Sequence, residues 1–118
     1  MPEEFRAEVR RRDGHAVIDM RGNVDRGAEP ALNAAYTDAA AGEEPVLLNF
    51  ADVDYINSTG IAVIVGLLAQ ARKEARSLTA CGLSEHYRQI FQITRLSDFM
   101  PIFDDEQAAV GASEAAGA

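Results

Sequence analysis

Residues 46–76 read VLLNFADVDYINSTGIAVIVGLLAQARKEAR, and this stretch decides the fold class. It opens with a short apolar run, 46–50, without clean alternation, which is typical of a strand buried on both faces of a parallel sheet. A second apolar run, 61–69, continues into strong helix formers up to residue 76, so the pattern predicts one long helix. A buried strand followed closely by a helix indicates an α/β domain.

The segments upstream of this stretch predict a hairpin and a helix. Apolar residues at positions 5, 7 and 9, and again at 16, 18 and 20, alternate with their neighbours in the manner of strands. Asp13-Gly14 lies between the two runs and is a strong signal for a hairpin turn. Residues 28–41 then carry apolar side chains at helical spacing, with Pro30 tolerated in the first turn.

The segments downstream predict a strand at 78–81, a helix after the N-cap Ser84, and an edge strand at 101–103. Asp104 and Gln107 resemble a capping box for a short last helix. The complete order predicts a mixed β-sheet of about five strands, with an N-terminal antiparallel hairpin, flanked by about four helices. We expect a single domain over residues 1–110 and a flexible C-terminal tail over residues 111–118, because the tail lacks bulky residues and apolar periodicity.

Composition limits the classes of partner. The 118 residues carry a formal charge of -8, which disfavours nucleic acid, whose phosphates would repel the chain. The apolar run 61–69 is far too short to span a bilayer, and the charged N-terminus is unlike a signal peptide, so we expect no membrane span and a cytoplasmic location. The only basic cluster, Arg6 with Arg10, Arg11 and Arg12, is interpreted as a solvated edge strand.

Residues that often carry chemistry are sparse. Cys81 is the single cysteine and is expected to be a small buried residue, which is compatible with a reducing compartment. His15 and His86 lack metal-ligand spacing and are expected at the surface. No nucleophile elbow, glycine-rich phosphate loop or paired-histidine motif is present, so the sequence predicts no enzyme, no metal and no cofactor. Small-molecule chemistry near Asp25 and Ser58 is the weakest of the alternatives.

Three polar residues, Asn57, Ser58 and Thr59, precede Gly60 where the long helix should begin. All three are good capping types, and a cap needs no biochemical role. A helix N-terminus also favours an anion, including a phosphate attached to a side chain. From the residues alone, both a cap and a phosphorylation site remain open, and the cap is favoured.

Two further features bear on this site. The helix that follows is apolar on all faces around Ile61, so its first turns must be buried all round or partly exposed for a partner. Asp25 follows the second strand, and sites of open sheets gather beyond the carboxyl ends of parallel strands. If the second and third strands leave the sheet on the same side, Asp25 could approach Ser58 as a hydrogen-bond acceptor or a Mg²⁺ ligand, although a turn explains it as well.

With these residues in view, the chain resembles the STAS family, which includes anti-sigma factor antagonists and the tails of sulphate transporters. The resemblance lies in Gly22-x-x-Asp25, in the apolar strand 46–50, and in the segment Tyr55 to Gly60 that enters an apolar helix. It follows the order of elements through roughly residues 5–110. The resemblance implies a STAS-like fold.

For a stand-alone antagonist, the resemblance implies binding to an anti-sigma factor that is also a serine kinase, with release of a sigma factor. It also implies that the kinase phosphorylates Ser58 and thereby ends binding, and that a serine phosphatase removes the phosphate again. The residues implied to surround the phosphorylation site and to face the partner are Asp25, Asn57, Thr59, Gly60 and Ile61. Asn57 stands where antagonists usually carry Asp, and Thr59 where a second serine is common. A monomer or weak homodimer is expected. The alternative is a non-catalytic scaffold subunit of a signalling assembly or a transporter-associated complex.

Overall fold

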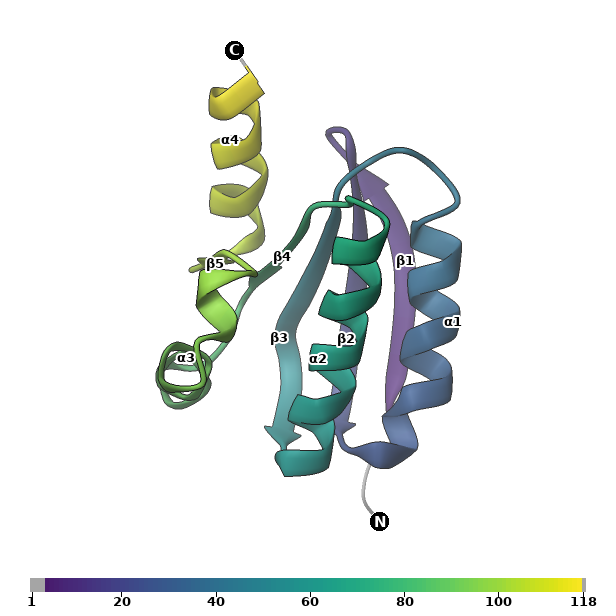
Figure 1. Ribbon diagram of the computed structural model, residues 1–118, viewed down its shortest axis with the longest axis vertical. Coiled ribbons are helices and arrows are strands. Elements are labelled where there is room, and N and C mark those ends of the chain that lie inside the picture. Colours follow the sequence, from purple (N-terminus) through teal and green to yellow (C-terminus); the bar gives the residue numbers. More distant parts are fainter. Residues whose placement is uncertain (1–3, 118) are drawn as a thin grey trace.

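The computed structural model describes residues 4–117, which build a five-stranded sheet with helices on both faces (Figure 1). The strands are β1 (Arg6–Arg12), β2 (His15–Val24), β3 (Val46–Ile56), β4 (Leu78–Cys81) and β5 (Ile102–Phe103), in that spatial order. The helices are α1 (Glu29–Ala39), α2 (Ser58–Lys73), α3 (Glu85–Ile93) and α4 (Glu106–Gly117), with short 3-10 helices η1 (Arg26–Ala28) and η2 (Leu96–Asp98). Among the described strands, only β1 and β2 pair antiparallel, so the predicted mixed sheet with its N-terminal hairpin is confirmed.

Most of β2 and the first half of β3 are buried on both faces because helices cover each face. Ala16, Ile18 and Met20 of β2 pack in the main core beneath α1 and α2, which lie on the same side of the sheet (Figure 1). Val17 points the other way, into a smaller cluster with Ala109 of α4. Since neighbouring residues of a strand face opposite sides, this double burial explains the continuous apolar runs in the sequence.

Strand β3 continues to Ile56, beyond the end at residue 50 that the apolar run predicts. Its second half is largely exposed and therefore carries no hydrophobic signal. It is a strand because it pairs with the end of β2, where Gly22 lies opposite Val53 and Val24 opposite Ile56. This extension brings the carboxyl ends of β2 and β3 together at one edge of the sheet.

Strand β1 is an edge strand and the side chains of Arg10 and Arg12 are 42% and 40% exposed, in keeping with a solvated edge, but both arginines also have partners on other elements. Both arginines donate hydrogen bonds to the carboxylate of Glu106 at the start of α4, and the Arg12 bond measures 2.6 Å. Arg10 also donates to Asp19 on the neighbouring strand. Arg11 instead donates to the carbonyl oxygen of Ala39, at the end of α1, over 3.1 Å. The cluster therefore fastens two helices to β1.

We expect Glu106→Gln to lower the free energy of unfolding by about 1 kcal/mol near neutral pH, because water screens the partly exposed arginines. The hydrogen bonds from Arg10 lower the pKa of Glu106 to about 2, from an ordinary value of 4.5. A carboxylate of this kind contributes stability above its unfolded pKa and loses it as the pH falls through the folded pKa. In urea titrations, the difference between wild type and variant should therefore shrink from pH 4.5 towards pH 2.

The control for this experiment is Glu85→Gln, the same change in the first turn of α3, where Glu85 is exposed. It should cost much less stability. A Glu106→Gln variant as stable as wild type at neutral pH would contradict the anchoring role.

The last helix also differs from the sequence-based expectation. Its N-cap is Asp105, whose carboxylate accepts a hydrogen bond from the Ala108 N–H at 2.8 Å, and not Asp104. The helix extends to Gly117, so residues 111–117 of the expected tail are helical, while residue 118 lies outside the described residues. The division into a domain and a flexible tail stays a prediction.

The histidines and the cysteine differ in burial. The expectation of a surface position is wrong for His15, which is only 4% exposed, because Pro45, Phe103 and Ala109 surround this end of β2. His86 is exposed as expected. Cys81 is fully buried beside α4, as predicted, and burial raises the pKa of its thiol to about 12.

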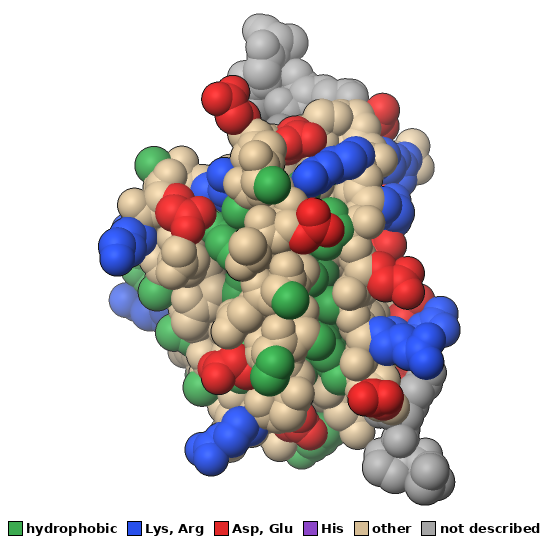
Figure 2. All heavy atoms as spheres, turned by 90° about the vertical axis from the view of Figure 1, so that its right-hand side faces the viewer, with side chains coloured by type: hydrophobic (Ala, Val, Ile, Leu, Met, Phe, Trp, Pro, Cys, Tyr) green, Lys and Arg blue, Asp and Glu red, His purple; other side chains and the backbone are tan. Residues whose placement is uncertain are grey.

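Charged side chains of both signs are spread over the face that carries α1, with hydrophobic side chains visible between them (Figure 2). The formal charge of -8 therefore does not produce a purely acidic surface on this side. A local excess of positive or negative charge therefore has to be identified from the individual residues of each site.

Candidate functional site

Asn57 caps the N-terminus of α2, which settles which of the three candidate residues is the cap. Its backbone is extended, and its side-chain oxygen accepts hydrogen bonds from the Gly60 N–H at 2.8 Å and from the Thr59 hydroxyl at 2.7 Å. Its own N–H donates to the carbonyl oxygen of Val24 at 3.2 Å. The neutral side chain of Asn57 thus accepts hydrogen bonds from the first turn of α2, and its backbone N–H ties this turn to β2.

Thr59 connects α2 to the η1 segment. Its hydroxyl donates to Asn57 and accepts a hydrogen bond from the Arg26 N–H at 3.2 Å. The single proton of this hydroxyl is therefore engaged, as is one of its two acceptor positions. Thr59 has a structural role, which the sequence could not reveal because Arg26 lies 33 positions away.

Ser58 is the first residue of α2, and its side chain is exposed. Its hydroxyl makes no hydrogen bond to any residue between 4 and 117. The positive end of the helix dipole and the free N–H groups of the first turn surround it, and both favour a negative charge there. Of the two adjacent hydroxyls, Ser58 is the one available to a partner.

Gly60 allows the first turn of α2 to approach the end of β2. A Cβ atom at this position would lie 1.9 Å from the carbonyl oxygen of Val24 and 2.6 Å from its carbonyl carbon. Both are backbone atoms that cannot rotate aside, so no other residue fits without displacing the helix. The glycine therefore sets the position of the Ser58 hydroxyl relative to the sheet.

The Asp25 segment reaches the site, although not in the way that the sequence suggested. Strands β2 and β3 do leave the sheet on the same side, which places Asp25 and Asn57 at one edge. Within the described part of the chain, however, the Asp25 carboxylate forms no hydrogen bond with Ser58, and the contact comes from the main chain of Arg26 to Thr59. No group of three or more potential metal ligands occurs among the described residues.

The exposed face of α2 is apolar and continues from Ser58. Val63, Ile64, Leu67 and Leu68 are buried against the core, and Ile61 is half-buried. The outward positions are Ala62, Val65, Gly66 and Ala69, and Val65 is 43% exposed. Of the two possibilities that the sequence left open for this helix, the structure shows partial exposure. Positions 58, 62, 65 and 69 follow helical spacing, so Ser58 lies at one end of this apolar face.

Tyr87 of α3 also contributes to the site. Its phenolic oxygen accepts a hydrogen bond from the Ile56 N–H at 3.0 Å, immediately before the cap residue. Tyr55 next to it is 55% exposed and adds an aromatic ring to the surface near the site. No local signal in the sequence could predict the Tyr87 contact, since the two residues lie 31 positions apart on different elements.

Comparison with known proteins identifies the family. The family model for the STAS domain matches residues 6–109. This chain belongs to the STAS domain family. The anti-sigma-B factor antagonist of Listeria monocytogenes is 33% identical over 97 residues, which cover 80% of this chain and 85% of that protein.

Solved STAS structures share the fold. A crystal structure of an anti-sigma factor antagonist from Mycobacterium paratuberculosis has a TM-score of 0.80 at 21% identity, covering 95% of this chain and 96% of that one. The phosphorylated form of the Bacillus cell fate determinant SpoIIAA has a TM-score of 0.65 at 22% identity, covering 90% and 96%. None of the helices described for this STAS domain has the length and apolar character needed to cross a membrane.

Proposed function

We propose that this STAS domain is an anti-sigma factor antagonist. It binds an anti-sigma factor that is also a serine kinase, which frees the sigma factor, and it loses this affinity when the kinase phosphorylates Ser58. The curated relatives are named as antagonists. The observation that carries the proposal is the exposed Ser58 hydroxyl, free of hydrogen bonds to described residues, at the positive end of α2 beside an apolar face. The cytoplasm, where sigma factors act, is the corresponding location.

The phosphorylation step transfers one phosphoryl group. The Ser58 oxygen attacks the γ-phosphorus of ATP held by the kinase, the bond to the bridging oxygen breaks, ADP leaves, and the hydroxyl proton passes to a base of the kinase. A serine phosphatase would hydrolyse the phosphate ester and restore the binding form. Because Asn57 is neutral, it adds no charge that would repel the phosphate, which carries about -1.5 to -2 at neutral pH.

Asp25, Thr59, Gly60 and Ile61 support the switch without accepting the phosphate. Thr59 and Gly60 hold the first turn of α2 against the end of β2, and the half-buried Ile61 packs against the core. Asp25 precedes the η1 segment, whose main chain contacts Thr59. These residues are expected to set the orientation of Ser58 towards the kinase.

The identity of the acceptor is tested with Ser58→Ala and Thr59→Val. After incubation with ATP and the cognate anti-sigma factor kinase, intact-mass spectrometry should show one phosphate on wild type and none on Ser58→Ala. Thr59→Val removes the second hydroxyl but retains its volume, and it should still accept one phosphate. Stoichiometric phosphorylation of Ser58→Ala would refute the site, and a large homo-oligomer without kinase binding would favour the scaffold alternative.

A further inference from the structure

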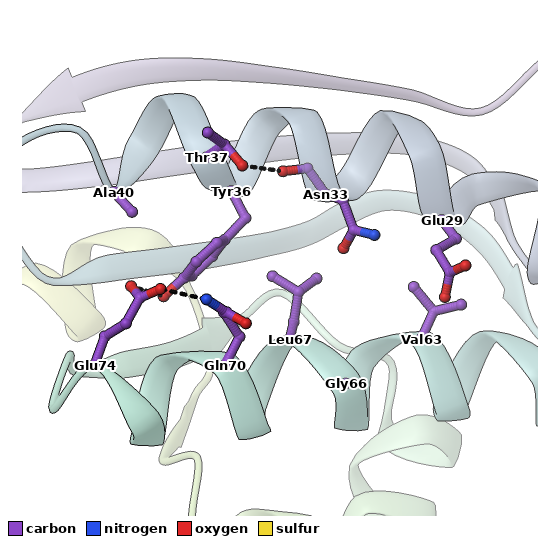
Figure 3. A pocket seen from close by; sticks show the side chains of 10 residues that line it. All are labelled: Glu29, Asn33, Tyr36, Thr37, Ala40, Val63, Gly66, Leu67, Gln70 and Glu74. Atoms are coloured by element: carbon purple, nitrogen blue, oxygen red, sulfur yellow. Dashed lines mark hydrogen bonds between the residues drawn. The ribbon is translucent and has the colours of Figure 1, made fainter.

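A groove of about 630 Å³ lies between α1 and α2, and along α2 it runs from Val63 to Glu74 (Figure 3). Val63 and Leu67 of α2 and Tyr36 of α1 form its apolar floor and are at most 7% exposed. Its exposed side chains are mostly polar: Glu29, Asn33, Thr37, Gln70 and Glu74. The Tyr36 hydroxyl donates to Glu74 at 3.0 Å across the far end of the groove. The groove is therefore a preformed cleft between two helices that the core holds in place.

Gly66 lines this groove, and the fold does not explain it. It lies within the 16-residue helix α2, where glycine is among the poorest helix formers. A Cβ atom at Gly66 would meet no atom within 4 Å, in contrast to Gly60. Because the isolated chain has room for a side chain here, the missing Cβ is best explained by the close approach of another molecule.

The charge of the groove is acidic at both ends. Glu29 of α1 lies at one end and Glu74 of α2 at the other (Figure 3). None of the described residues that line the groove is basic. Arg76 forms an ion pair with Glu74 over 3.8 Å, which offsets part of the charge at that end, and it also donates to the carbonyl oxygens of Ala40 and Glu44. An occupant with an apolar centre and a positive charge near each end would be complementary.

The walls of the groove favour a helical occupant. Both walls are helices, whose backbone groups already bond within each helix, so an extended segment would find few partners for its own N–H and C=O groups. A helix satisfies its backbone internally. From Val63 to Glu74, α2 rises by about 16 Å, which matches about three turns of a second helix.

On the basis of the proposed function, we infer that this groove receives a short amphipathic helix of the anti-sigma factor kinase. The small or apolar face of that helix packs on Gly66, and a basic residue lies near each end, opposite Glu29 and Glu74. Ser58 and the groove, which lie on the same helix, then both contact the kinase. A second copy of this chain is the weaker occupant, because two chains of formal charge -8 repel each other.

The first test uses Gly66→Ala, which should raise the stability of the protein and lower its affinity for the kinase. The methyl group improves helix propensity, so the melting temperature should rise by about 3 °C. It also blocks close approach, so the affinity for the kinase, measured by calorimetry, should fall by about tenfold. Gly111→Ala is the matched control, since Gly111 is a helical glycine of α4 where an added Cβ would likewise meet no atom within 4 Å. It should leave affinity unchanged.

The second test examines charge and the identity of the occupant. Glu29→Lys should weaken kinase binding by about tenfold, whereas Glu85→Lys on the exposed start of α3 should have little effect. Hydrogen exchange of the complex should show protection in α1 and in a helical, basic segment of the kinase. Protection of an extended kinase segment, or of a second copy of this chain, would overturn the inference.

The outcomes separate the groove from the proposed function. If the kinase phosphorylates Ser58 while Gly66→Ala and Glu29→Lys bind like wild type, the groove inference alone is refuted. If wild type neither binds the kinase nor accepts phosphate, both proposals fail. Weaker binding of the groove variants, together with a stabilised Gly66→Ala protein, supports both.

Discussion

Gly60→Ala is expected to lower the free energy of unfolding by at least about 3 kcal/mol, which is large for the addition of one methyl group. The new Cβ would lie 1.9 Å from the Val24 carbonyl oxygen, so the start of α2 would have to move away from β2. That movement would strain or break the hydrogen bonds from Asn57 to Val24 and from Arg26 to Thr59. Urea denaturation followed by circular dichroism measures the loss.

Gly66→Ala is the matched control for this prediction, because it adds the same methyl group to the same helix at a position with open space. Gly60→Ala should be less stable than wild type, and Gly66→Ala should be more stable. If the free energy of unfolding of Gly60→Ala lay within about 0.5 kcal/mol of the wild-type value, the N-terminal end of α2 would move more easily than its packing implies.

Ser58→Asp should weaken binding of the kinase by about 100-fold and leave the melting temperature within about 2 °C of wild type. The fold tolerates the carboxylate because it lies exposed at the positive end of α2, where an anion is mildly favourable. The complex does not tolerate it, because burying an unpaired charge against an apolar surface is costly. Calorimetry measures the affinity and differential scanning calorimetry the melting temperature.

Ser84→Asp provides the matched control for the charge. Ser84 is the exposed N-cap of α3, so the same replacement of serine by aspartate is placed at another helix N-terminus. It should change neither affinity nor melting temperature appreciably. A fall of many degrees for Ser58→Asp would contradict the view that this helix end accepts negative charge.

The sequence predicts the elements whose signal is local. The hairpin at Asp13-Gly14, the long helix after Asn57 and the buried start of β3 each follow from neighbouring residues. The second half of β3 escapes prediction because it is exposed and depends on pairing with the end of β2. The roles of Arg10 and Arg12 escape it because their partner, Glu106, is more than 90 positions away.

The site shows the same division between local and distant information. Asn57, Ser58 and Thr59 could be recognised together as residues suited to a helix start. Their separate roles as cap, free hydroxyl and tether depend on where the η1 segment passes, and only the folded chain places Arg26 against Thr59. The sequence could likewise identify the apolar residues of α2 but not which of them face outward.

The burial of Cys81 has a practical consequence. Because burial raises the thiol pKa to about 12, very little thiolate forms at pH 8, and the sulfur is covered by protein as well. Because Cys81 is the single cysteine, maleimide reagents should leave the native protein unlabelled. A fluorophore can therefore be attached to one introduced surface cysteine in the otherwise wild-type chain, so that single-molecule observation of the kinase complex requires no cysteine-free background.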